Sequence, residues 1–181
     1  WTVRVRDSAG VLQFAQSGTG STFSATWDGT KSGSTVPDGT YAASVTAVDA
    51  WANGPTTGTA SLVVDTAPSQ LEALAPAADV VQWFAPNGDG YRDTVALTAK
   101  NSEAGSFTVR VRDYAGTLLR KYTVTSGTGP TTVSWDGRDA GGAVVPDVSY
   151  VMRISPADAL GNTGTAAERT VSVVAALRSV A

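Results

Sequence analysis

Apolar and polar residues alternate with a period of two in short stretches along this chain. Residues 1–7 and 107–113 show the pattern most clearly, because in both an aromatic residue and two valines alternate with threonine and two arginines. Such alternation is typical of antiparallel strands with one face on a core and one in water. Turn residues separate the stretches about every ten residues, as a β-sandwich requires. The pattern therefore predicts an all-β fold.

The expected strands form two series. In the first part of the chain they are residues 1–7, 11–15, 22–27, 40–49 and 59–65. In the second part they are residues 80–84, 94–99, 107–113, 117–124, 131–135, 149–157 and 166–174. Seven strands complete a sandwich, whereas the first series has five.

The two series also share turn motifs in the same order, which predicts a tandem duplication. The paired motifs are Trp27-Asp28-Gly29 with Trp135-Asp136-Gly137, Val36-Pro37-Asp38 with Val145-Pro146-Asp147, and Asp49…Asn53 with Asp158…Asn162. We expect two domains, 1–68 and 69–181, joined by a short stiff linker around Pro68 and Pro76. Both are expected to be immunoglobulin-like antiparallel sandwiches, the first lacking its N-terminal strands.

The five-strand series leaves an open sheet edge, which is an aggregation risk. Either the chain is truncated ahead of Trp1 or another polypeptide supplies the missing edge. The tail, residues 175–181, is short and mildly apolar. It is expected either to fray or to pair with an exposed edge.

Composition narrows the possible functions. The chain has 181 residues, 42% hydrophobic, and a net charge of −3, so nothing favours a nucleic-acid or anionic-membrane partner. No apolar run reaches the roughly 20 residues of a membrane helix. Cysteine and histidine are absent, which excludes disulfides, thiolate or histidine metal sites, and histidine-based triads within this chain.

The segment 85–93, Ala-Pro-Asn-Gly-Asp-Gly-Tyr-Arg-Asp, is the candidate metal site. Asn87, Asp89 and Asp93 could each give a side-chain oxygen and Tyr91 a carbonyl, and oxygen ligands are what calcium prefers. Ala85 cannot ligate, so a neighbouring loop or water would have to complete the site, with an affinity of about 10⁻⁴–10⁻³ M. The alternative is a metal-free turn in which the same side chains accept backbone amides.

The ordered set of motifs resembles a known family. Residues 84–93 look like the PNGDG-x-x-D signature of bacterial surface modules, and Trp-Asp-Gly, Val-Pro-Asp and Asp-x-x-x-Asn follow it. This order is similar to FlgD-type immunoglobulin-like domains, which occur in the flagellar hook-capping protein and in tandem on secreted bacterial proteins. The resemblance implies an immunoglobulin-like sandwich that acts as a spacer, sorting or binding appendage.

Aromatic residues offer two further interpretations. Trp51 lies in a loop and could contact a glycan, although loop aromatics often simply cap a core. Trp27 and Trp135 are expected in the core. Tyr41 and Tyr150 follow Pro-Asp turns, which predicts a tyrosine corner whose hydroxyl bonds back to the main chain.

These observations favour a non-catalytic spacer or presentation module of a secreted or cell-surface bacterial protein, stiffened by calcium. Its partners would be the rest of a larger parent protein or neighbouring subunits. The alternatives are an adhesion module for a cell-wall polymer or glycan, and an assembly subunit of a hook cap or surface filament. No pair of acid and base residues is visible, so an enzyme is not expected.

Overall fold

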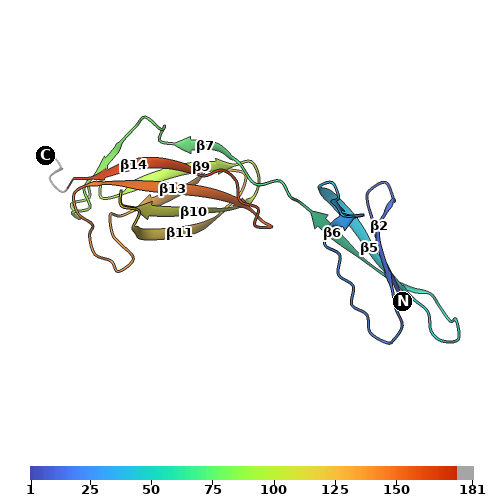
Figure 1. Cartoon of the computed structure of the whole chain (residues 1–181). Helices are drawn as coiled ribbons and strands as arrows, with labels where there is room; N and C mark the ends of the chain where they lie inside the picture. Colours follow the sequence, from blue (N-terminus) through green and yellow to red (C-terminus); the bar gives the residue numbers. More distant parts are fainter. Residues whose placement is uncertain (175–181) are drawn as a thin grey trace. The chain divides into compact units, whose positions relative to one another are not determined.

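The computed structural model describes residues 1–174, so the expectation for the tail lies outside the described residues. The chain divides into two compact units, Trp1–Ala67 (unit 1) and Pro68–Ala181 (unit 2). Every regular element between residues 1 and 174 is a β-strand (Figure 1). The all-β prediction is confirmed.

Unit 2 is a sandwich of two sheets. The larger sheet has the order β11 (Leu118–Ser126), β10 (Gly105–Arg112), β13 (Ser149–Asp158), β14 (Ala167–Val173) and β8 (Gln82–Phe84). The smaller sheet has the order β12 (Thr131–Trp135), β9 (Val95–Asn101) and β7 (Leu71–Ala75). The strands pair antiparallel except for β8, which runs parallel to β14.

The core of unit 2 follows from the period-2 pattern. Phe107, Val109 and Val111 on β10 are fully buried, while the residues between them are partly exposed. Leu97 on β9 and Trp135 at the end of β12 face them and are also fully buried. Each strand thus places alternate side chains between the two sheets, which is the arrangement that drives sandwich formation.

Unit 1 has one four-stranded sheet and a short hairpin. The sheet order is β2 (Leu12–Ser17), β1 (Thr2–Arg6), β5 (Gly39–Ala47) and β6 (Thr56–Val64). The hairpin consists of β3 (Thr30–Lys31) and β4 (Ser34–Thr35). The strand order β2-β1-β5-β6 corresponds to the order β11-β10-β13-β14 of unit 2. The pairing register also shifts at the same place in both sheets, at the end of β1 in unit 1 and at the end of β10 in unit 2.

Several turn contacts recur in the two units. The Tyr41 hydroxyl donates to the Pro37 carbonyl at 2.6 Å, and that of Tyr150 donates to Pro146 at 2.8 Å, so the tyrosine-corner prediction is confirmed. Each tyrosine ring packs edge-on against the tryptophan of its unit, with centroids 5.3 Å apart in both. Trp135 is fully buried, as expected, while its counterpart Trp27 is only partly buried.

Three strand expectations differ from the structure. Residues 22–27 form no strand, although their counterpart β12 is regular. β12 receives its ladder from β9, and residues 1–67 contain no counterpart of β9. The segment around Pro68 and Pro76 was expected to be a linker, but it contains the strand β7. The hairpin of β3 and β4 was also not expected.

Candidate functional site

The segment 85–93 lies between β8 and β9 and is anchored at both ends. Phe84 and Ala85 are buried, and the Ala85 amide donates to the Arg92 carbonyl at 2.8 Å. Asp93 is followed closely by Val95, the first buried residue of β9. The loop is therefore held by core residues on either side, while its tip faces solvent.

Side-chain oxygens of this loop bind its own backbone amides. Asp93 accepts from the Gly88 amide at 2.7 Å through Oδ1 and from the Gly90 amide at 2.8 Å through Oδ2. Asn87 Oδ1 accepts from the Asp89 amide at 3.0 Å. Asp89 Oδ1 accepts from the Tyr91 amide at 2.8 Å, and Asp89 Oδ2 accepts from Asn87 Nδ2 at 3.1 Å. Asn87, Asp89 and Asp93 are thus joined in one hydrogen-bonded loop.

The two glycines of the loop have the conformation that makes these bonds possible. Gly88 has a φ of +79° and Gly90 a φ of +83°, in the left-handed region that glycine adopts without cost. Their amides consequently turn inward, toward the Asp93 carboxylate. Arg92 also has a positive φ, of +52°, where a side chain costs energy.

The donor set of the loop is compatible with both interpretations of the sequence. Carboxylate and amide oxygens and a backbone carbonyl are ligands that suit calcium. A carboxylate offers about four lone-pair positions, so two amide bonds leave Asp93 able to contact an ion. The same amide bonds are what a metal-free turn requires. Calcium binding by Asn87, Asp89, Tyr91 and Asp93 stays a prediction.

A contact that sequence reasoning missed ties this loop to the Trp-Asp-Gly motif. A Cβ on Gly137 would lie 2.6 Å from Pro86 Cγ and 3.1 Å from the Phe84 ring, so the proline packs directly on the glycine. Gly137 also has a φ of +68°. Phe84 packs edge-on against Trp135, with centroids 5.4 Å apart. Two motifs far apart in the sequence therefore form one packed end of the sandwich.

Trp51 is 83% exposed and lies in the turn between β5 and β6. Asp49 organises this turn, because it accepts from the amides of Trp51 and Asn53 and from the Asn53 side chain. These hydrogen bonds, the Asn53 side chain first, lower the pKa of Asp49. The counterpart of Trp51 in unit 2 is Leu160, which is 60% exposed. Glycan contact by Trp51 stays a prediction.

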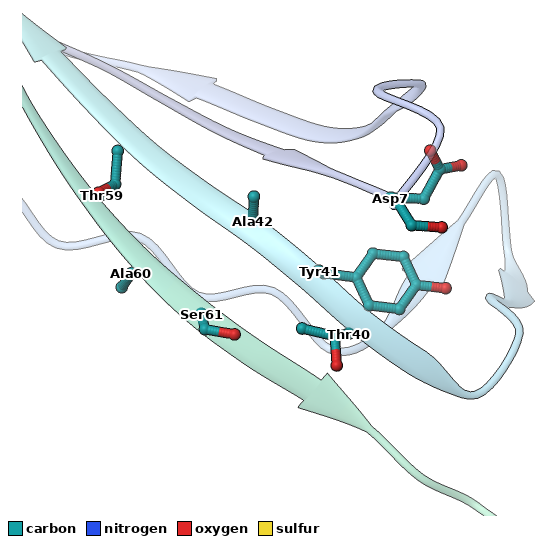
Figure 2. A pocket seen from close by; sticks show the side chains of 8 residues that line it. Asp7, Thr40, Tyr41, Ala42, Thr59, Ala60 and Ser61 are labelled. Carbon is teal, nitrogen blue, oxygen red and sulfur yellow. The ribbon is translucent and has the colours of Figure 1, made fainter.

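Figure 2 shows a shallow pocket of about 530 Å³ in unit 1, along β5 and β6. Its titratable groups are Asp7 and Tyr41. Asp7 accepts from two backbone amides and from the Gln13 side chain, and Tyr41 donates to Pro37. Both groups are thus engaged in holding turns, and the pocket places no second acid beside Asp7.

The sandwich and its motif order define the class of unit 2 as an immunoglobulin-like β-domain. Residues 85–159 match the family model of the FlgD Ig-like domain. This part of unit 2 is therefore similar to the FlgD Ig-like domain, and the match covers less than half of the chain. Among curated proteins, none matches the sequence.

Several solved structures are similar to the chain. FlgD of Xanthomonas campestris, described for hook capping, is 23% identical over 54% of this chain and 66% of its own, with a TM-score of 0.43. Latent PorU of Porphyromonas gingivalis is 17% identical over 77% of this chain and 13% of its own, with a TM-score of 0.42. The fibronectin(III)-like modules of Clostridium thermocellum CbhA are 14% identical over 99% and 82%, with a TM-score of 0.47.

These structural likenesses are remote and assign no function to the chain. The aligned region spans less than two thirds of the FlgD chain and a small part of PorU. Over residues 1–174, none of the elements is a helix of the length and apolar character that crossing a bilayer requires.

Proposed function

We propose that this chain is a non-catalytic structural module that spaces or presents another part of a larger secreted or cell-surface bacterial protein. The observation that carries the proposal is the FlgD Ig-like match of residues 85–159, which falls within a complete β-sandwich. Such sandwiches are compact units packed around one core, so they suit a role as a connecting element.

The use of the acidic side chains supports a structural role. Four aspartates accept hydrogen bonds from backbone amides of the turn that each of them begins. They are Asp7, Asp49, Asp113 and Asp158. Aspartates engaged in this way hold hairpin ends in place. These four aspartates thus serve to form turns.

We also propose that unit 1 is a second copy of the same domain. Its sheet has the strand order of the corresponding part of unit 2. The Arg6 guanidinium donates to the Gly10 carbonyl as Arg112 does to Gly116. Trp27 Nε1 donates to the Thr30 carbonyl as Trp135 does to Arg138, at 2.8 Å in both. An experimental structure of the chain tests this assignment, because the strands of unit 1 should superpose on their counterparts in unit 2.

A display experiment tests the presentation role. The chain is placed between a bacterial surface anchor and a reporter epitope, and compared with a fusion that lacks it and with a Gly-Ser linker of equal length. We expect antibody binding to the reporter to exceed that of the fusion that lacks the chain and to differ from that of the flexible linker, because folded units have a fixed length whereas a Gly-Ser chain samples many lengths. Equal antibody binding in all three would contradict the role.

The loop formed by Asn87, Asp89, Tyr91 and Asp93 is proposed to take one calcium ion that stiffens unit 2. With a Kd of about 10⁻³ M, 10 mM calcium would stabilise the folded state by about 1.4 kcal/mol. Thermal melting in calcium and in chelator measures this, with Asp93→Asn as the matched control. A melting temperature that calcium leaves unmoved contradicts the metal proposal and supports the metal-free turn.

An adhesion role is the second candidate, because Trp51 is 83% exposed in a turn that Asp49 and Asn53 hold. Exposed aromatic rings are suited to stacking on sugars and to interfaces. A glycan array probed with the chain and with Trp51→Ala tests it. Binding that the substitution abolishes would favour adhesion over the spacer role, and an array without signal would contradict adhesion.

A further inference from the structure

The larger sheet of unit 2 carries three basic side chains in line on its outer face. Its strands β11, β10, β13 and β14 lie side by side (Figure 1), and alternate residues of each strand point away from the core. Arg110 on β10 pairs directly with Lys121 on β11 and with Arg153 on β13. Residues that are opposite each other on neighbouring strands share a face, with Cβ atoms about 5 Å apart. We call these three residues the basic row.

The charges of the basic row are only partly neutralised. Arg153 forms a salt bridge of 3.0 Å with Glu168, its register partner on β14. Within residues 1–174, Arg110 and Lys121 form no salt bridge. Like charges that lie directly opposite each other destabilise a sheet. The basic row therefore costs folding stability unless an anion lies over it.

The corresponding strands of unit 1 show that this sheet does not require the three charges. Arg4 on β1 has the same place in its strand as the middle cation of the basic row. It pairs with Ala15 on one side and with Ser44 on the other, where unit 2 has Lys121 and Arg153. The two outer cations are thus a feature of unit 2 and not of the strand arrangement that the two units share.

A row of hydroxyl side chains lies beside the basic row. Thr108, two residues from Arg110 on β10, pairs with Thr123 on β11 and with Ser155 on β13. Thr123 is exposed, and the other two are half-buried. A hydroxyl group can both donate and accept a hydrogen bond. This hydroxyl row can therefore contact neutral polar groups of a ligand whose anionic groups lie on the basic row.

An exposed tryptophan lies on the same face of the sheet. Trp83 on β8 pairs with Ser172 on β14, and their neighbours Phe84 and Val173 point the other way, into the core. Trp83 is 53% exposed. It lies two strand spacings and four residues along the strands from Arg153, which is roughly 16 Å. One outer face thus presents cations, hydroxyl groups and an aromatic ring.

We propose that the outer face of this sheet binds a linear acidic polysaccharide. Carboxylates of the polymer contact the basic row, where guanidinium groups form paired hydrogen bonds with them. The hydroxyl row binds hydroxyl groups of the sugars, and Trp83 stacks on a sugar ring further along the polymer. The proposal goes beyond the spacer role, and the site does not involve Trp51.

Other polyanions match this face less well. An acidic peptide would use the basic row and leave Trp83 without a role. Single-stranded nucleic acid binds where several aromatic side chains stack on successive bases. Among the described strands of this sheet, Trp83 is the one aromatic residue that points outward. A polymer of acidic sugars uses the charges, the hydroxyl groups and the single ring together.

Binding of the full chain to immobilised polygalacturonate, measured by biolayer interferometry in the presence of a chelator, tests the proposal. The chelator prevents calcium from bridging the polymer to the protein. We expect binding in low salt that becomes at least about tenfold weaker in about 0.5 M salt, because salt screens exposed charges. Neutral dextran should not bind.

The two units supply matched variants. The double substitution Lys121→Ala and Arg153→Ser gives unit 2 the residues of unit 1, and it should weaken binding at least about tenfold. Arg4→Gln removes a cation that has no charged register partner, and it should change binding by less than about twofold. Trp83→Ala should weaken binding about fivefold to tenfold, since it removes the ring that stacks on a sugar. Thermal melting of each variant verifies that it is folded.

Several outcomes would overturn the proposal. They are no binding of polygalacturonate, and equal losses in Arg4→Gln and in the double variant. Polyglutamate or oligothymidylate bound as tightly as polygalacturonate, with no effect of Trp83→Ala, would make an acidic peptide or a nucleic acid the occupant. Binding that Trp51→Ala abolishes and Trp83→Ala leaves unchanged would assign the polymer to unit 1. The display experiment does not depend on polymer binding, so its failure would affect the module role alone.

Discussion

The contact between Pro86 and Gly137 provides a sharp test, because the chain contains a matched control. Gly137 and Gly29 occupy the same place in the Trp-Asp-Gly turns, with φ values of +68° and +75°. Alanine in this left-handed conformation costs roughly 1–2 kcal/mol at either position. Only Gly137→Ala also forces a methyl group to within 2.6 Å of Pro86 Cγ.

The steric cost of such overpacking is about 1–3 kcal/mol. Gly137→Ala should therefore destabilise unit 2 by about 2–5 kcal/mol, and Gly29→Ala should destabilise unit 1 by about 1–2 kcal/mol. Guanidinium unfolding followed by tryptophan fluorescence measures the free energy of unfolding. Hydrogen exchange of peptides from each unit assigns the transitions.

A double-mutant cycle isolates the contact. Pro86→Ala shortens the side chain above Gly137, so it should relieve part of the cost of Gly137→Ala and leave that of Gly29→Ala unchanged. Equal losses for the two glycine variants would refute the reasoning. So would a cycle in which Pro86→Ala and Gly137→Ala are simply additive, because neither result is compatible with a rigid contact between the two motifs.

Three further outcomes are expected. Tyr150→Phe removes the 2.8 Å bond to the Pro146 carbonyl and should lower the free energy of unfolding of unit 2 by about 0.5–1.5 kcal/mol in urea titrations. Burial raises the pKa of Asp158, but hydrogen bonds from Asn162 and nearby amides outweigh it, and the net pKa is below 3.8. The contribution of this carboxylate to the free energy of unfolding is present above about pH 4 and is lost as pH falls through the lowered pKa. Between pH 6 and pH 2, the free energy of unfolding of Asp158→Asn should therefore fall by less than that of the parent chain, as measured in acid titrations. Trp51→Ala should change the free energy of unfolding, obtained from thermal melting, by less than about 0.5 kcal/mol. A larger loss would show that the ring caps a core.

Most strands were predictable because burial on one face imposes a period of two. Residues 131–135 were predicted as a strand and are one, with ladder bonds to β9. Residues 22–27 carry the same alternation and form none, because a strand also requires a partner, which local sequence does not reveal. β7 was not predicted because the segment that contains it lies between Pro68 and Pro76, and a proline-bounded segment of small residues is typical of a linker.

The candidate metal loop was located from sequence, but its state was not decided. Alternating Asn87, Asp89 and Asp93 predict convergent oxygens, and the structure joins them through backbone amides. The same oxygens can bind a calcium ion or accept hydrogen bonds in a metal-free turn, so the spacing of these residues alone does not distinguish a metal site from a turn. The packing of Pro86 on Gly137 could not be predicted, since it depends on how distant segments meet.

The parallel pairing of β8 with β14 has a consequence for how unit 2 responds to tension. Residues 82–84 lie near the start of the unit and residues 171–173 near its end. A pull on the polypeptide at both ends would draw β8 toward its amino end and β14 toward its carboxyl end. The two strands would slide past each other in shear, so their ladder bonds would resist together, whereas an antiparallel pair at this place would unzip one bond at a time.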